Sequence, residues 1–409
     1  MTLYTALSLL LGLWILGHIL VFGILFRKTK YFAVILSTIL LVAIYVIKPA
    51  TFDLPRYSVY FETGIPPWET TYPSKKEGWK LDELSETEQS EYYSNFFPHS
   101  PAFNFLLDVA RDVLPHGSFL PRIITERHVA DSLVLLVGIL GLALLAVALT
   151  LLRSTSKESV SMLYSHGLAI VGVLGSLFFF VGSQNSLRQF LGSCFSVLAL
   201  AAFVRSKHGL ASASILFSFL FHPWSPALAV FSVLFVKARQ IIQAATVSER
   251  WKNLINEYLL AAVLSVVCII WIKLGIKLGL PYFTTYFQID TSDEIFRTAA
   301  TVKLALVVTV LVITDILAGR PGKEWLFDPA SLRRCFLILF APLVIYPEIF
   351  SRLLMFYFAV EMIYLVWAFR HSKRRVQLSG CVTFLAYALA LNALNILLDK
   401  GWKEALFNA

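Results

Sequence analysis

The feature that most constrains the fold of this chain is a series of ten apolar runs, each near the length that crosses a lipid bilayer. A helix needs roughly 20 residues to traverse the ~30 Å hydrocarbon core. With 57% hydrophobic and only 15% charged residues over 409 positions, the chain is predicted to be an all-α polytopic membrane protein, a single transmembrane domain over 1–409. The runs cover residues 3–26, 31–50, 132–152, 162–182, 187–204, 259–280, 302–319, 335–350, 352–369 and 377–398.

One further apolar segment, 209–236, is interrupted near its middle by His222, Pro223, Trp224, Ser225 and Pro226. The segment is too long for one ordinary span and too short for two full crossings. Proline fits the first turn of a helix and breaks its interior. We therefore expect a re-entrant broken-helix pair with an imidazole at its tip. Broken helices at membrane depth usually line a cavity where something binds.

Lysine and arginine clusters predict the orientation, because short cytoplasmic loops are enriched in these residues. If 209–236 returns to the side it came from, all six basic clusters face the cytoplasm. If it crosses, the three largest clusters land outside. The re-entrant topology is thus favoured, with both termini extracytoplasmic. The clusters are Arg27, Lys28 and Lys30; Arg153 and Lys157; Arg205 and Lys207; Lys237, Arg239, Arg250 and Lys252; Arg320, Lys323, Arg333 and Arg334; and Arg370, Lys373, Arg374 and Arg375.

Two longer connections carry their own signals. The segment 51–131, between the second and third spans, has seven Lys or Arg against thirteen Asp or Glu, an acidic bias expected of an extracytoplasmic loop. Within it, Ser100 and Pro101 precede an amphipathic pattern typical of a helix that lies on the membrane surface or roofs a cavity. The segment 238–258 is predicted to be a cytoplasmic amphipathic helix at the interface.

On the predicted topology, several ionisable residues gather at the outer leaflet. Arg188 begins a span, and Arg352 lies in a tight outer turn over 346–352. Asp53 and Arg56 follow the second span, and His222 is at the tip of the broken segment. Two arginines, a carboxylate and an imidazole suit a substrate with an anionic head group and a hydroxyl to be activated. Taken singly, each arginine could instead reach lipid phosphates.

Other features exclude competing classes of site. The four cysteines form no CxxC pair, so neither a disulfide framework nor a zinc site is suggested. No carboxylate cluster of the kind that binds Mg²⁺ appears at the predicted site, so a reaction without metal or other cofactor is expected. The net charge of +9 reflects basic loops and not a nucleic-acid partner. Within the spans, Asp315 and Glu361 are expected to pair with Lys303, Lys273 or Lys277.

The ordered motifs resemble a family. Asp53, Tyr57 and Phe61 match the D-x-x-x-Y-x-x-x-F element of EpsG/Wzy-type bacterial polysaccharide polymerases. Asn185, Arg188 and Gln189 resemble its R-Q element, and His222 and Ser225 its H-x-S element. Arg352, Phe356 and Tyr357 resemble its C-terminal arginine-led element. Order and spacing agree from residue 53 to about 358. The chain departs from the pattern in the polar stretch 65–98, which looks like an insertion, and at His99, where the family has a glutamate.

The resemblance implies a polymerase that joins undecaprenyl-diphosphate-linked oligosaccharides at the outer face of the bacterial inner membrane, among membrane lipid, with chain-length regulator and flippase proteins as partners. Negative charge grows on the diphosphate as it leaves, and arginines stabilise such charge with forked donors. Arg188 and Arg352 are the candidates, and His222 or Asp53 is the candidate base. The candidate substrate-binding residues are Tyr57, Arg56, Asn185, Gln189, Ser225 and Tyr357.

Three other classes of protein remain open from the sequence. A membrane acyltransferase also uses histidine and arginine on about ten spans, but it normally has those elements early in the chain. A polysaccharide flippase usually has two homologous halves, which are not evident here. A non-catalytic assembly scaffold needs no convergent set of ionisable residues.

Overall fold

The computed structural model describes most of the apolar part of the chain, and every regular element in the described residues is helical. Five helices are long and apolar enough to cross a membrane, judged by length and composition. The prediction of a helical membrane protein is therefore confirmed, whereas ten spans stays a prediction. The described residues are 3–26, 28–47, 57, 100–115, 131–152, 162–179, 182, 186–244, 257–278, 294–318, 328–371 and 373–398.

The helices follow the predicted apolar runs closely, because the apolar length alone limits where a spanning helix can end. The predicted run 187–204, for example, is α9, Leu187–Val204. The other helices are α1 Leu3–Leu25, α2 Lys30–Ile47, α5 Pro101–Val113, α6 Asp131–Leu152, α7 Met162–Leu174, α10 His208–Phe221, α11 Pro226–Ala244, α13 Glu257–Lys277, α15 Glu294–Ala318, α16 Pro329–Phe340, α17 Pro347–Arg370 and α18 Arg374–Leu398.

Two runs are not continuous helices. The predicted span 335–350 consists of α16 followed by a 3-10 helix, Ala341–Ile345. Pro342 explains the change, since proline removes an N–H donor and clashes inside an α-helix. The predicted span 162–182 ends as α7 at Leu174. Beyond it, the Ser176 hydroxyl donates to the Val173 carbonyl and accepts from the Phe179 N–H, which turns the chain into a new helical turn.

The chain forms two compact units, and the single transmembrane domain stays a prediction. Unit 1 contains residues 1–48, 152–180 and 231–409, and unit 2 contains residues 49–151 and 181–230. The boundary after residue 230 falls inside α11, just past the predicted break.

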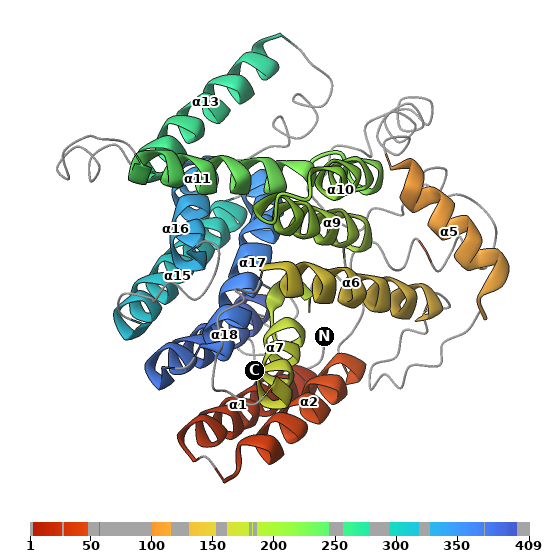
Figure 1. Ribbon diagram of the computed structural model, residues 1–409, viewed down its shortest axis with the longest axis vertical. Coiled ribbons are helices and arrows are strands. Elements are labelled where there is room, and N and C mark those ends of the chain that lie inside the picture. The colour runs from red at the N-terminus through yellow and green to blue at the C-terminus, as the bar shows by residue number, and fades with distance from the viewer. Residues whose placement is uncertain are drawn as a thin grey trace. The chain divides into compact units, whose positions relative to one another are not determined.

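Unit 1 is organised around α17. In its spanning part, Leu353–Arg370, 94% of the residues are buried, compared with 22% in the spanning part of α13. A helix that is apolar on all sides is either a core helix or a membrane span, and its burial places α17 in the core of unit 1. α17 packs on α7, α16 and α18, while α18 packs in turn on α1 and α15 (Figure 1).

One end of unit 1 brings several basic segments together. Arg239 of α11 bonds to Asp328 at the start of α16, with Nη1 to Oδ2 at 3.1 Å. Tyr258, at the start of α13, accepts from Arg334 of α16 at 2.9 Å. The two flanks of the connection between α11 and α13 thus meet at the same helix end. The cytoplasmic location of the basic clusters stays a prediction.

The predicted amphipathic helix at 238–258 is described only at its ends. Residues 238–244 are the last turns of α11, and Glu257 already belongs to α13. Residues 245–256 lie outside the described part.

In unit 2, α9 is the most enclosed of the spanning helices and packs along α10 (Figure 1). The predicted amphipathic helix of the long loop is α5. It buries Phe103, Leu107 and Ala110 and contacts α10. Ser100 occupies the N-cap position, although its side chain makes no capping hydrogen bond, so the fixed φ of Pro101 is the local signal that begins this helix.

Candidate functional site

The predicted break is present between α10 and α11. α10 ends at Phe221, and His222 has an extended backbone (φ −159°, ψ 118°). The turn is closed by its own backbone: the His222 N–H donates to the Ser218 carbonyl, and the Ser225 N–H donates to the His222 carbonyl, each at 3.0 Å. The backbone groups freed by the break are therefore largely satisfied, as membrane depth requires. The return of the chain to its starting side stays a prediction.

The His222 imidazole is half-buried and lies beside Ser225. Nδ1 of His222 is 3.3 Å from the Ser225 Oγ, which is itself 3.5 Å from the Gln189 carbonyl oxygen. Both contacts are long for hydrogen bonds. They nonetheless link the imidazole, through Ser225, to the first turn of α9.

Close approach at this point depends on Gly192 of α9. A Cβ added there would meet the Ser225 Oγ at 2.6 Å and the His222 Cβ at 3.1 Å. Small residues at helix contacts let backbones come close in membrane proteins. Gly192 is one reason why the break lies against α9.

Arg188 shares this face of α9. It precedes Gly192 by four residues, and positions i and i+4 lie one above the other on a helix. Arg188 is in the first turn, its side chain is half-buried, and its Nε atom is fully buried. The structure thus brings His222 and Ser225 to the Gln189 end of α9, three of the ten residues predicted for the site, and Arg188 is the residue just before Gln189.

The other predicted residues are distributed as follows. Tyr57 is buried in unit 2, where its ring packs against Phe103 of α5 at 5.5 Å between centroids. Arg352 belongs to the second turn of α17, so its predicted position in a tight turn is wrong; Pro347 begins the helix earlier than the apolar run suggests. The side chain of Arg352 is not among those described. Asp53, Arg56 and Asn185 lie outside the described residues.

Tyr357 is fully buried in unit 1 and lies close to Glu361. This position is part of a cluster of charges that sequence reasoning did not predict. At its centre is Arg333, whose side chain is 0% exposed. Its guanidinium donates to Glu361 Oε1 at 3.0 Å, to Asp315 Oδ1 at 2.8 Å and to the Thr314 hydroxyl at 2.8 Å. It also lies over the Tyr364 ring, 3.8 Å from the centroid.

The predicted partners of Asp315 and Glu361 are therefore wrong. Both carboxylates pair with arginines of α16, and Arg334 supplies a second bond to Asp315 at 2.7 Å. The prediction placed Arg333 and Arg334 in a basic loop because it began the apolar run at residue 335. Asp328 caps the helix by accepting from the Ala330 N–H, and Pro329 follows it. That Asp-Pro pair was a local signal for an earlier start.

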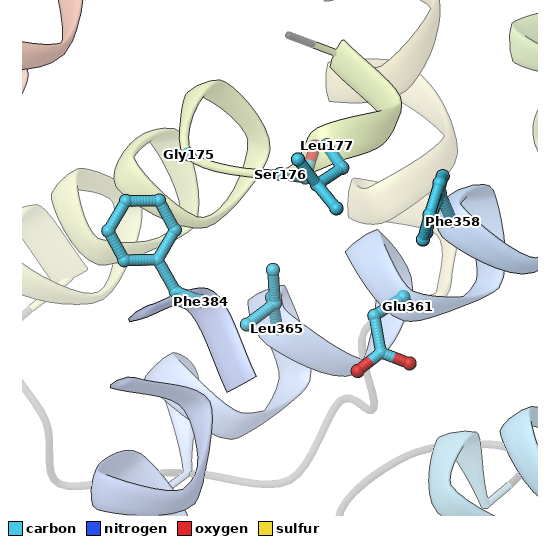
Figure 2. A pocket seen from close by; sticks show the side chains of 7 residues that line it. All are labelled: Gly175, Ser176, Leu177, Phe358, Glu361, Leu365 and Phe384. Carbon is cyan, nitrogen blue, oxygen red and sulfur yellow. The ribbon is translucent and has the colours of Figure 1, made fainter. Parts of the chain in front are cut away.

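Two arginines and two carboxylates balance the charge of this cluster. Because it joins α15, α16 and α17 through buried bonds, we assign it a structural role. A neighbouring cavity of about 10 Å³ is lined by residues 175–177, which follow α7, and by α17 and α18; it has room for about one water molecule (Figure 2). In Figure 2 the Glu361 carboxylate points away from Ser176 and Leu177. The cavity is too small for a sugar.

Sequence reasoning also missed two serines that hold the break. Ser196 of α9 and Ser218 of α10 are both fully buried, with their hydroxyl oxygens 2.8 Å apart. The signal was present as small residues four apart, Gly192 with Ser196 and Ser214 with Ser218.

No protein-family model, curated protein or solved structure matches the chain.

Proposed function

We propose that this chain is a membrane glycosyltransferase that polymerises undecaprenyl-diphosphate-linked oligosaccharides at the outer face of the bacterial inner membrane. The observation that carries the proposal is the junction of α9 and α10, where His222 and Ser225, in a break of an apolar helix, pack on Gly192, four residues after Arg188 on α9. The motif resemblance described above supports the same reaction.

The chemistry needs a group that stabilises negative charge and a group that accepts a proton. A sugar hydroxyl attacks the anomeric carbon, the bond from that carbon to the diphosphate oxygen breaks, and the diphosphate leaves with the electron pair. Arg188 carries a permanent positive charge and several N–H donors, and it lies at a helix N-terminus, which also favours anions. We assign Arg188 to the leaving diphosphate.

His222 is the candidate base, because a neutral imidazole takes up a proton near neutral pH. In this assignment the hydroxyl proton passes to His222 as the new glycosidic bond forms. Asp53 remains the alternative base, and Arg352 a second donor to the diphosphate. Arg56, Tyr57, Asn185, Gln189, Ser225 and Tyr357 remain candidate substrate-binding residues.

The burial of Tyr357 favours a different role for that residue. Its ring is 1% exposed and lies beside the Arg333 cluster. We therefore propose that Tyr357 supports α17 and rank it below the other substrate-binding candidates.

The test is the surface glycan of a deletion strain that carries plasmid-encoded variants. His222→Ala is expected to shorten the glycan to a single repeat, since general acid–base groups contribute roughly 10²–10⁴-fold in rate. His222→Gln retains hydrogen bonding without proton uptake and should fail as well. His208→Ala, at the exposed other end of α10, is the matched control and should keep long glycans.

Full-length glycan in the His222→Ala strain, at the same protein level as wild type, would remove His222 from the mechanism. If the deletion strain keeps its polymer and loses acetyl groups instead, the protein is an acyltransferase and the proposal is wrong.

A further inference from the structure

The hydroxyl of Ser196 contacts both ends of the turn that contains His222. On one side, Ser196 Oγ is 2.8 Å from Oγ of Ser218, in the last turn of α10. On the other, it donates to the Ser225 carbonyl at 2.6 Å. The Ser218 carbonyl in turn accepts from the His222 N–H. One side chain of α9 therefore touches both the last turn of α10 and the break itself.

The number of hydroxyl hydrogens limits which of these contacts are hydrogen bonds at the same time. The two hydroxyls carry one hydrogen each, but three short contacts are present, because Ser218 Oγ also lies 2.8 Å from the Gly192 carbonyl oxygen. Ser196 has its best acceptor in the Ser225 carbonyl. Ser218 then donates either to Ser196 or to the Gly192 carbonyl, and in both cases the donation holds α10 against α9.

Burial makes these hydrogen bonds costly to lose. Both hydroxyls are fully buried, and a buried polar group without a hydrogen-bond partner costs more free energy than an exposed one, which can bond to water. The Ser225 carbonyl also accepts from the Leu228 N–H at the start of α11, so the same oxygen anchors the next helix.

We infer that Ser196 is the positioning residue for His222: its hydroxyl fixes the break on α9 and thereby fixes the imidazole near the first turns of α9, which carry Arg188. The inferred catalytic effect rests on the proposed function, whereas the effect on the position of the break does not. Ser196 itself contacts no substrate in this assignment.

The chain offers a closely matched control in Ser193. This serine is on the same helix and equally buried, and its hydroxyl has no hydrogen-bond partner among the described residues. Ser193→Ala therefore removes the same atom as Ser196→Ala without removing a hydrogen bond. Ser196→Thr keeps the hydroxyl and serves as the rescue variant.

The first measurement is independent of function. A Trp224→Cys reporter lies in the break at a residue that is 44% exposed; Cys194, Cys335 and Cys381 are buried, and the partly exposed Cys268 is replaced by serine in every variant. The rate of maleimide labelling of the reporter in isolated membranes is expected to rise with Ser196→Ala, up to the roughly 5- to 30-fold that one or two lost hydrogen bonds give. Ser193→Ala and Ser196→Thr should leave the rate within about twofold.

The second measurement is polymerisation in proteoliposomes, with the lipid-linked oligosaccharide extracted from the deletion strain as substrate. Ser196→Ala is expected to lower kcat about 5- to 30-fold with little change in KM, because a displaced base slows the reaction and leaves ground-state binding intact. Ser196→Thr should restore kcat.

The outcomes separate the two proposals. Faster labelling without polymerisation by the wild-type protein would retain the positioning role and reject the polymerase. Unchanged labelling in Ser196→Ala would overturn the positioning role, whatever the effect on kcat. Faster labelling with unchanged kcat would show that His222 is held but not used, and would overturn its link to Ser196 in catalysis.

Discussion

Replacing Arg333 with alanine should destabilise the protein far more than the same change at Arg334. Both arginines bond to Asp315, at 2.8 and 2.7 Å, but Arg333 also bonds to Glu361 and Thr314. The side chain of Arg333 is 0% exposed and that of Arg334 is 35% exposed. The pair therefore compares a buried ion-pair cluster with a partly exposed ion pair to the same carboxylate.

The structure gives the expected magnitudes. Arg333→Ala leaves the Glu361 carboxylate, which is 4% exposed, without its counter-charge. Breaking a buried pair from one side costs about 3–5 kcal/mol. We expect about 3 kcal/mol, because Glu361 can limit the cost by taking up a proton. A partly exposed ion pair contributes about 0–1 kcal/mol, so Arg334→Ala should lie in that range.

The assay is thermal unfolding of the purified protein in detergent, followed by the fraction that remains monodisperse. Arg333→Ala should lower the midpoint by several degrees more than Arg334→Ala. The double variant Arg333→Met with Glu361→Gln should recover much of the lost thermal stability. Replacing both charges of a buried ion pair costs less free energy than removing only one, because no unpaired charge is left buried. Equal midpoints for the two single alanine variants would refute the reasoning from burial.

Further predictions concern the site, the helix ends and the topology. Gly192→Val should displace the break and lower the yield of folded protein, because the added Cβ meets the Oγ and Cβ of Ser225 and the Cβ of His222; Gly138→Val, with nothing within 4 Å of the added Cβ, is the control by size-exclusion chromatography. Arg188→Lys should lose most polymer on a glycan gel, since lysine keeps the charge without the planar fork; normal chain length would demote Arg188 to a lipid contact. Burial, and then the charge of Lys373, lower the pKa of His371 to about 4. The fold thus favours the neutral imidazole, so stability should fall as pH drops from about 6.5 towards 4; His371→Asn should flatten this part of a melting-temperature profile. A cysteine replacing Ser248 should resist impermeant reagents in intact cells, and its labelling would reject the re-entrant topology.

The sequence by itself determined the class of fold and most helix bounds. The predicted run 187–204 and α9 coincide, and the break at His222 lies where the proline pattern places it. These features depend on local rules: bilayer thickness sets the length of an apolar helix, and proline limits where a helix continues. The predicted start of α16 was wrong, because it was taken from the apolar run at residue 335 and not from the capping residue Asp328.

The sequence also gave part of the candidate site. Arg188 and His222 were both proposed from motifs, and the contact of Gly192 with the break places His222 on α9, four residues from Arg188 along that helix. That contact is not a local property. A small residue shows that close approach is allowed, but not which helix uses it.

Tertiary structure alone decided the partners of the buried polar groups. Asp315 and Glu361 were expected to bind lysines and instead bind Arg333, and Ser196 was not singled out until its hydroxyl was found between α10 and the break. Spacing along a helix shows which residues share a face. The partner across that face depends on how distant helices pack, because a buried charge or hydroxyl takes whichever complementary group the packed core places within hydrogen-bond distance.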